Sequence, residues 1–381
     1  MTEKLYYQDA YIKDFVAKVI SVTPCDGGYD VVLDKTAFFP EEGGQSADTG
    51  FIGSSKVINV WEIDGAVHHL TTTDPVIGEN HCIIDFDDRF EKMQCHTAEH
   101  ILCGIIHRLY GFDNVGFHLG IDEVTFDVNG VLDRGQLDLV ENIANDAVFT
   151  NIKIETYFPD GTELKSIEYR SKLDITEGVR LVKIGDVDTC ACCAPHVGYS
   201  GEIGLIKILD FMKHRGGTRI WMVAGKRTLK DYRVKYENIK NISARLCAPQ
   251  NETDTVLGEY MKDAENARAL LKQSRMRIAE LEACQVEATD KSAVFYLQDF
   301  SISELIAFSN TASHKIGGMT VALSGVDGDY KYVISSSALD LKELSGDINN
   351  ALSGRGGGRK EMIQGSFAAS LDEIKSYFAE K

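Results

Sequence analysis

The chain has 381 residues, of which 44% are hydrophobic and 26% charged, so it can form ordinary globular cores. At roughly 150 residues per domain, its length corresponds to two or three domains. Acidic residues outnumber basic ones by 58 to 40, and the formal net charge of −18 excludes a protein that is basic all over. The start has no signal-like apolar segment, and no run approaches the roughly 20 apolar residues of a membrane span. We expect a soluble, cytoplasmic protein without a membrane partner.

The first 90 residues are rich in β-branched and aromatic runs separated by turn residues. We expect strands at 29–33, 56–63 and 81–86. Short strands at regular spacing indicate a small barrel or sandwich, and we assign residues 1–90 to an N-terminal β-barrel.

The pattern changes at about residue 91, where helices and strands begin to mix. Leu102, Ile105, Ile106 and Leu109 fall on one helical face, and Gly111 is a stop signal. Apolar residues mark a second helix at Leu137, Val140, Ala144 and Ala147. Strand-like runs follow at 152–157, 179–184, 203–209 and 218–223. We expect an α+β domain over 91–240, and an α+β multidomain protein overall.

The segment 241–290 is predicted to be helical and has the clearest periodicity in the chain. After Pro249, heptad a positions are filled by Leu257, Ala264, Leu271 and Ile278, and d positions by Tyr260, Ala267, Ser274 and Leu281. Seven of these eight residues are apolar, which favours a coiled coil, although one long helix packed on its own domain fits the pattern too. Residues 291–381 form a separate α/β domain, with strands at 295–297, 319–323 and 332–335 and an amphipathic segment at 367–379.

Two distant segments carry residues that suit a metal ion. His96 and His100 stand four apart on the expected helix, so they share one face. Nearly a hundred residues later, the sequence CACCAPHV offers Cys192 and His196. Nine cysteines without a secretion signal argue against a disulfide framework, and imidazole with thiolate suits zinc.

The identity of the sulfur ligand stays open, because Cys190 and Cys193 are alternatives to Cys192. Four protein ligands are typical of structural zinc, whereas a catalytic zinc needs an open position, so the sequence does not decide the role of the metal. Glu99 is a candidate proton carrier, but a solvent-exposed carboxylate on the helix surface fits its position better.

Positive charge is concentrated in one stretch of this acidic chain. The stretch 213–240 contains nine Lys or Arg residues and only two acidic residues, Asp231 and Glu237. This excess of positive charge predicts a phosphate-binding patch or a solvated helix face. Tyr232 and Tyr236 could stack on bases, but core positions are more usual for such residues. A second basic segment, GRGGGRK at 354–360, is expected to be a loop. The candidate phosphate-binding residues are Lys213, Arg215, Arg219, Lys226, Arg227, Lys230, Arg355, Arg359 and Lys360.

The motifs TAFFPEEGGQSADTG (36–50), HTAEHIL (96–102), CCAPHV (192–197) and GTRIWMVAG (217–225) occur in the order found in the editing domain of alanyl-tRNA synthetases. GRGGGRKEMIQGS (354–366) resembles the glycine-rich signature of the DHHA1 domain that closes those synthetases. The chain as a whole resembles the freestanding AlaX family in its long form. No aminoacylation domain is recognisable, so we expect no ligase activity.

The resemblance implies a zinc-dependent hydrolase that removes serine, and in some members glycine, from mischarged alanine tRNA. By position, it implies His96, His100, Cys192 and His196 as the Zn²⁺ ligands, and Thr36 and Gln45 as pocket residues. It further implies tRNA as partner and a homodimer formed through the coiled coil and the DHHA1 domain. The family pattern CGGTHV is changed to CCAPHV here, which bears on the choice between serine and glycine.

Two other functions remain as alternatives. A catalytically silent tRNA-binding protein with a structural zinc would fit the altered CCAPHV segment. A DHH-type phosphoesterase is disfavoured because no DHH triplet occurs; the closest sequence is Val67-His68-His69.

Overall fold

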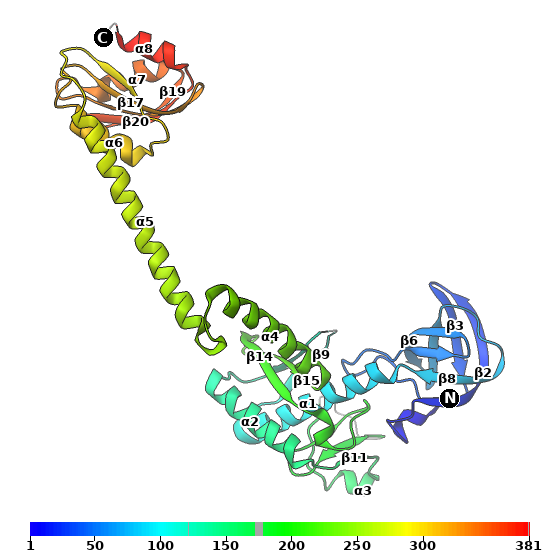
Figure 1. Ribbon diagram of the computed structural model, residues 1–381. Coiled ribbons are helices and arrows are strands. Elements are labelled where there is room, and N and C mark those ends of the chain that lie inside the picture. The colour runs from blue at the N-terminus through cyan, green and yellow to red at the C-terminus, as the bar shows by residue number, and fades with distance from the viewer. Residues whose placement is uncertain (121, 172–177, 380) are drawn as a thin grey trace. The chain divides into compact units, whose positions relative to one another are not determined.

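The computed structural model describes residues 1–120, 122–171, 178–379 and 381. The chain divides into two compact units, Met1–Ile239 and Lys240–Lys381, and the division falls within helix α4 (Lys226–Leu246). Both units combine helices with β-sheets, so the predicted α+β class is confirmed (Figure 1). No helix within the described ranges is long and apolar enough to cross a membrane.

The first unit begins with a closed six-stranded barrel. Its strands follow the order β2-β3-β7-β6-β5-β8. They are β2 (Asp14–Cys25), β3 (Gly28–Leu33), β5 (Gly50–Ile52), β6 (Ser55–Ile63), β7 (Ala66–Thr71) and β8 (Gly78–Ile84). Side chains along each strand alternate between the barrel interior and the outside. On β2, Ala17 and Val19 are buried, whereas Val16 and Ile20 are half exposed. Outside the barrel, β1 (Glu3–Lys4) pairs in parallel with β4 (Lys35–Thr36), and η1 (Leu5–Tyr7) follows β1.

Helix α1 (Phe86–Tyr110) leaves the barrel and runs beside α2 and β15 (Figure 1). It begins five residues earlier than predicted, because the Asp85 carboxylate caps it by accepting from the Asp88 amide. Gly111 ends it in the left-handed conformation, with φ at 69°. The helix is buried on almost every side from residue 92 to 106, so its polar residues face protein rather than water.

Two sheets and helix α2 (Arg134–Thr150) surround α1. The predicted core positions of α2 are buried, and an Asp133–Gln136 capping box starts the helix. The four-stranded sheet has the order β14-β15-β10-β9 and the three-stranded sheet the order β11-β12-β13. Their strands are β9 (Asn114–Leu119), β10 (Val124–Val128), β11 (Ile154–Tyr157), β12 (Leu181–Ile184), β13 (Asp188–Ala191), β14 (Ile206–His214) and β15 (Gly217–Ala224). Short helices α3 (Gly161–Leu164) and η2 (Ser200–Ile203) lie between these strands in the chain.

A buried ion pair joins the barrel to α1. Arg89 and Asp48 are 0% and 1% exposed, and the Arg89 Nε atom lies 2.9 Å from both carboxylate oxygens of Asp48. The same carboxylate accepts from the Phe39 amide at 2.6 Å, and Arg89 donates to the Ala37 carbonyl at 2.6 Å. All charges and donors of this pair are therefore satisfied inside the protein, which is the condition for a buried pair to be tolerated.

The second unit contains α5 (Thr253–Cys284) and a five-stranded sheet of order β16-β17-β18-β20-β19. Its strands are β16 (Ala293–Tyr296), β17 (Thr320–Val326), β18 (Asp329–Ser335), β19 (Gly354–Gly358) and β20 (Met362–Phe367). Its other helices are η3 (Gln250–Glu252), α6 (Ile302–Ala312), α7 (Leu341–Ala351) and α8 (Leu371–Ala379).

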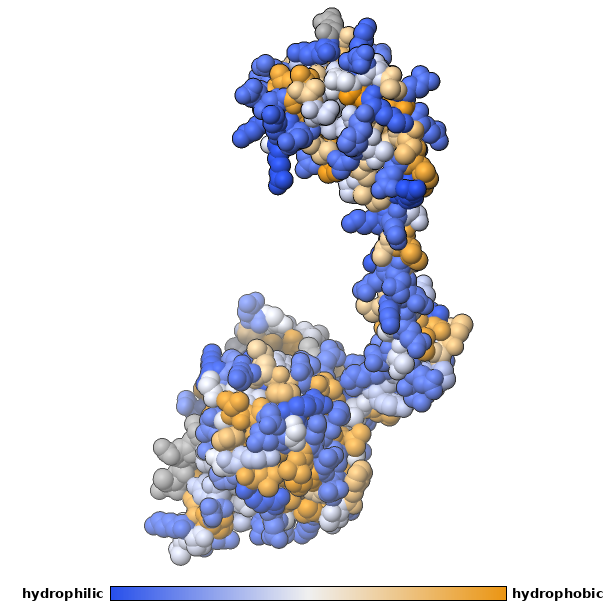
Figure 2. All heavy atoms as spheres, turned by 90° about the vertical axis from the view of Figure 1, so that its left-hand side faces the viewer, coloured by the Kyte–Doolittle hydropathy of each residue, from blue (hydrophilic) through white to orange (hydrophobic). Residues whose placement is uncertain are grey.

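Helix α5 packs on its own unit only near its C-terminal end, where Ala279 and Ala283 are buried against α6. Most of the predicted heptad residues face solvent, including Tyr260 at 68% and Leu271 at 61% exposure. Apolar residues accordingly appear among polar ones along this helix (Figure 2). The heptad stripe is thus largely exposed in the part of the chain that the structure describes.

The expectation that GRGGGRK is a loop is wrong. Residues 354–358 form edge strand β19, which pairs with β20, and a tight turn at Arg359–Met362 follows. The glycines allow close approach: a Cβ on Gly356 would lie 2.4 Å from the Tyr332 hydroxyl oxygen. Arg355, Arg359 and Lys360 are all exposed.

The link between α5 and α6 predicts an acid-sensitive stability. Arg275 on α5 donates to both carboxylate oxygens of Glu304, at 2.6 and 3.0 Å, and this contact lowers the pKa of Glu304 below its usual value. The contribution of the ionised Glu304 carboxylate to folding stability is complete above the unfolded-state pKa of about 4.3. It is lost as pH falls through the lowered folded-state pKa. We expect Glu304→Gln to have its full stability cost at pH 7 and a smaller cost as pH falls below about 4, measured by thermal unfolding. A difference that stays constant with pH would contradict this.

Candidate metal centre and its cavity

Helix α1 brings the first two candidate ligands together. His96 and His100 are one turn apart, with ring centroids separated by 5.3 Å, and they are 3% and 4% exposed. A helix that is buried all round can hold two imidazoles in fixed positions, because packing leaves few rotamers open to them.

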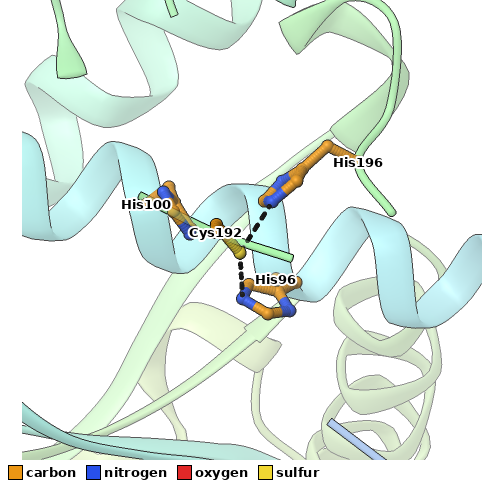
Figure 3. Close-up of side chains that lie close together, drawn as sticks. All are labelled: His96, His100, Cys192 and His196. Atoms are coloured by element: carbon orange, nitrogen blue, oxygen red, sulfur yellow. Dashed lines mark hydrogen bonds between the residues drawn. The ribbon is translucent and has the colours of Figure 1, made fainter. Parts of the chain in front are cut away.

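The second pair comes from residues 192–198, the segment after β13, which we call the thiol loop. The Cys192 sulfur lies 3.4 Å from His196 Nε2 and 3.6 Å from His96 Nε2. The donor atoms of His96, His100, Cys192 and His196 all lie within 4.8 Å of one another. Figure 3 shows the four side chains converging, two from α1 and two from the thiol loop.

These distances match a tetrahedral zinc site. Zn–S and Zn–N bonds of about 2.3 and 2.05 Å at the tetrahedral angle give a sulfur–nitrogen separation of about 3.6 Å. The two sulfur–nitrogen separations above are close to this value. The donor set of three imidazoles and one thiol therefore fits zinc in both chemistry and spacing.

Each imidazole is oriented through its Nδ1 atom. His96 Nδ1 lies 2.9 Å from the Gln45 side-chain oxygen, and His100 Nδ1 lies 3.3 Å from an Asp188 carboxylate oxygen. His196 Nδ1 lies 3.0 Å from the Thr97 hydroxyl, which itself donates to the Met93 carbonyl at 2.7 Å. Nδ1–H is therefore the donor in all three rings, and each Nε2 lone pair is available to a metal.

The ionisation states of Cys192 and His196 favour metal binding, whereas at His100 the effect of burial is outweighed by Cys190, Asp188 and Cys192, which hold its pKa well above the ordinary value. Burial alone would raise the pKa of the Cys192 thiol, but the neighbouring His96 and His196 outweigh it and hold that pKa well below its ordinary value. Burial lowers the pKa of His196 to about 3. Thiolate and neutral imidazole are the forms that bind a metal ion.

The other two thiols of the segment lie in different surroundings. Cys193 packs with Tyr6 and Tyr7, and burial, together with the charges of Cys192 and Glu42, raises the pKa of its thiol. Cys190 lies on β13 and forms a second possible metal group with His100 and Asp188. Among the described residues, only Cys192 shares a group with all three histidines.

A cavity of about 1280 Å³ opens beside the four candidate ligands, and its wall includes His96, His100 and Cys192. Glu99 lines it as well and is only 4% exposed, so the interpretation of Glu99 as a surface carboxylate is wrong. Its carboxylate accepts hydrogen bonds from the Asn114 amide and from the Cys103 thiol, the latter at 3.2 Å. The cavity thus has an oriented carboxylate next to the histidines.

The two predicted pocket residues have different environments. Gln45 contacts His96, and its Nε2 atom is buried without a hydrogen-bond partner among the described residues. Thr36, on β4, is fully buried against barrel strand β7, where its hydroxyl lies 2.9 Å from His69 Nε2 and accepts from the Phe38 amide at 3.1 Å. Neither Thr36 nor Gln45 is among the described residues that line the cavity, and the pocket role of Thr36 stays a prediction.

Several of the predicted phosphate-binding cations are held by acidic side chains. Arg227 is 6% exposed, and it pairs with Glu91 at 2.8 Å and donates to the Gly120 carbonyl at 2.7 Å. It therefore anchors α4 to α1, and the expectation of an exposed phosphate ligand is wrong for this residue. The further pairs are Arg219–Asp127 at 2.7 Å, Lys226–Asp87 at 2.7 Å and Lys230–Asp122 at 3.0 Å.

The exposed part of this region is the turn after β14 and one face of α4. Lys213 and Arg215 are both exposed. Tyr232 and Tyr236 are 63% and 41% exposed, and their rings stack with centroids 6.2 Å apart, so the core interpretation is wrong for both.

Thr97 and Asp188 were not predicted from the sequence. Thr97 sits inside the HTAEH motif and Asp188 lies two residues before CACC, but nothing in the pattern distinguishes a residue that orients a ligand from its neighbours. Arg170, which binds both Asp188 oxygens at 2.7 and 2.8 Å, carries no sequence signal either.

The role of Thr97 gives a testable expectation. Thr97→Val keeps the shape but removes the acceptor for His196 Nδ1, and we expect zinc affinity to fall by about 10–100-fold in a competition titration with a chelator. Thr218→Val is the matched control, because Thr218 is equally buried and accepts from the Leu132 amide at 2.9 Å, outside the metal group. Equal zinc affinity in the two variants would show that the Thr97 hydroxyl does not orient the ligand.

Known proteins are similar to this chain in sequence. Residues 179–224, which include the thiol loop, match the family described as threonyl and alanyl tRNA synthetase second additional domain. The chain is AlaX-like and related to the alanyl-tRNA synthetases. Along its whole length it is similar to the alanyl-tRNA editing protein AlaX-L of Pyrococcus horikoshii: the two are 28% identical over 408 aligned positions, covering 100% of this chain and 98% of that protein.

Alanine–tRNA ligases are similar over part of their length. The enzyme of Halobacterium salinarum is 32% identical over 354 residues, which cover 86% of this chain and 38% of the ligase. This chain thus spans about two fifths of the length of such ligases. A solved structure, the C-Ala domain of Aquifex aeolicus alanyl-tRNA synthetase, matches 25% of this chain and 94% of that one at 19% identity, with a TM-score of 0.22.

Proposed function

We propose that the protein is a zinc-dependent hydrolase that edits mischarged alanine tRNA in the cytoplasm, with seryl-tRNA as its main substrate and glycyl-tRNA as a second one. The observation that carries the proposal is the buried group of three imidazoles and one thiol, which opens on a cavity, in a chain similar to AlaX-L from end to end. His96, His100, Cys192 and His196 would hold the zinc.

The reaction is hydrolysis of the ester between the amino acid and the terminal ribose of the tRNA. With all four protein ligands in place, bound zinc would have to accept a further ligand in order to supply a Lewis acid for the ester carbonyl or for the attacking water. Glu99 lies in the cavity with one carboxylate oxygen 4.0 Å from His100 Nε2. We propose that the Glu99 carboxylate accepts a proton from the attacking water. It then donates this proton to the departing ribose oxygen as the ester bond between the carbonyl carbon and that oxygen breaks.

Selection of serine over alanine requires a polar group that pairs with the extra hydroxyl. We propose Gln45 for this role, because its Nε2 atom is an unsatisfied donor beside His96, whereas the Thr36 hydroxyl is already paired. Gln45→Glu keeps an acceptor for His96 and removes the donor. It should lower the seryl-to-alanyl rate ratio more than Thr36→Val does.

For the tRNA body, we propose the exposed end of β14 and the turn after it, with Lys213 and Arg215, together with the Tyr232–Tyr236 face of α4. Lys230 belongs to this surface as well, because its side chain is 74% exposed despite its pairing with Asp122. Exposed cations and stacked tyrosines suit phosphates and unpaired bases. In the second unit, Arg355, Arg359 and Lys360 are exposed and suit the same partner. The solvent-exposed heptad stripe of α5 supports a homodimer through this helix and the DHHA1-like domain.

The direct test is deacylation of seryl-, glycyl- and alanyl-tRNA for alanine, measured side by side with zinc-loaded protein. We expect seryl-tRNA to be hydrolysed fastest and correctly charged alanyl-tRNA to be spared. Equal inertness toward all three esters, in folded protein that binds the tRNA, would reject the hydrolase and leave a silent tRNA-binding protein.

A further inference from the structure

An aromatic pair lies on the cavity wall, outside the metal group and outside the predicted site residues. Tyr7 ends η1, and Phe158 follows β11; both line the cavity. Their rings meet edge to face, with centroids 5.5 Å apart and an interplanar angle of 75°. Phe158 is nevertheless 53% exposed, so about half of the surface of this large apolar side chain has no partner among the described residues.

The pair is fixed relative to the thiol loop. The Arg180 guanidinium lies 5.4 Å from the centre of the Tyr7 ring and is only 6% exposed. Its Nη1 atom donates to the carbonyls of Cys192 and Ala194, both at 2.9 Å. Tyr7 also packs in one cluster with Cys192 and Cys193. Tyr7 therefore links Phe158 to the candidate sulfur ligand within one wall of the cavity.

The chemistry of this wall suits a nucleobase. An exposed ring held from behind by a second ring offers a flat apolar surface, and base–aromatic stacking is tolerant of base identity. That tolerance is sufficient here, because every mature tRNA ends in the same adenosine and no edge of the base has to be read. The aminoacyl ester sits on the ribose of that adenosine, so base and ester must be bound in the same cavity.

We propose that Phe158, backed by Tyr7, stacks on the terminal adenine of the tRNA and so places the ester beside the histidine–cysteine group. This inference rests on the proposed function for its ligand, and it adds a binding site for the base. Phe158 is in these terms a positioning residue: it contacts the nucleoside and takes no part in proton transfer.

The experiment is a double-mutant cycle read by binding of uncharged tRNA, with fluorescence anisotropy of the zinc-loaded full chain. One arm compares the natural 3′ end with an end whose terminal ribose carries no base. The other arm compares wild type with Phe158→Ala. Phe158→Tyr keeps the stack. Phe149→Ala is the matched control, because Phe149 is a 71% exposed phenylalanine on α2 that does not belong to the described cavity wall.

We expect removal of the base to weaken binding by about tenfold in wild type, Phe158→Tyr and Phe149→Ala, and by less than twofold in Phe158→Ala. An undiminished base effect in Phe158→Ala would overturn the inference even if seryl-tRNA is hydrolysed. A base effect that depends on Phe158 would uphold the stacking site even if no ester is hydrolysed, so the two proposals can fail separately.

Discussion

Replacing Cys192 by alanine is expected to remove bound zinc and to lower the rate of seryl-tRNA hydrolysis on the order of a thousandfold. Rate losses of this size are typical when an enzyme loses a group that stabilises charge in the transition state. The sulfur lies next to two of the three imidazoles, at 3.4 and 3.6 Å. Without its negative charge, the remaining neutral imidazoles hold a divalent cation less tightly. Zinc content by mass spectrometry and single-turnover deacylation rates measure the two effects.

The neighbouring thiols provide matched controls for Cys192→Ala. Cys193 points into the tyrosine cluster, so Cys193→Ala should keep zinc and retain activity within a few-fold. Cys190→Ala should keep zinc as well, because Cys190 groups only with His100 and Asp188 among the described residues. Loss of zinc from either control, with zinc retained in Cys192→Ala, would show that the sulfur ligand is a different residue.

Replacing Asp48 by alanine is expected to lower the free energy of unfolding of the first unit by about 3–5 kcal/mol, because Arg89 is left as an uncompensated buried charge. The Phe39 amide loses its acceptor at the same time. Both tryptophans, Trp61 and Trp221, lie in the first unit, so urea unfolding followed by their fluorescence reports on that unit.

Asp231→Ala is the control for the buried pair. Asp231 pairs with Lys235 at 2.7 Å on the surface of α4, where the lysine side chain is 62% exposed. Such a surface pair contributes less than about 1 kcal/mol. If Asp48→Ala cost no more than Asp231→Ala, the Arg89–Asp48 pair would not be a main link between the barrel and α1.

Periodic features of the fold were predictable from the sequence. The apolar positions Leu137, Val140, Ala144 and Ala147 lie on the buried face of α2, because a 3.6-residue repeat fixes which side faces the core. The start of α1 was placed too late, since the decisive signal was the Asp85 cap rather than the apolar repeat. The glycines of β19 suggested a loop, but their small size allows close strand pairing next to Tyr332.

The sequence predicted the candidate metal ligands but not the residues that orient them. His96 and His100 share a helix face by spacing alone, and clustered thiols pointed to the other half. Which thiol faces the histidines depends on the path of the thiol loop, which Arg180 fixes from a distance of twelve residues along the chain. Arg227 resembled a phosphate ligand in sequence, but the carboxylate that pairs with it lies on α1, 136 residues away.

The central claim is that α1 and the thiol loop bind one zinc ion through three imidazoles and a single thiolate. X-ray absorption at the zinc edge of the zinc-loaded full chain tests it most directly. We predict one sulfur at about 2.3 Å and nitrogen ligands at about 2.0–2.1 Å, with the sulfur signal missing in Cys192→Ala. Two or more sulfur ligands, or a shell of nitrogen and oxygen alone in the unmodified protein, would contradict the account.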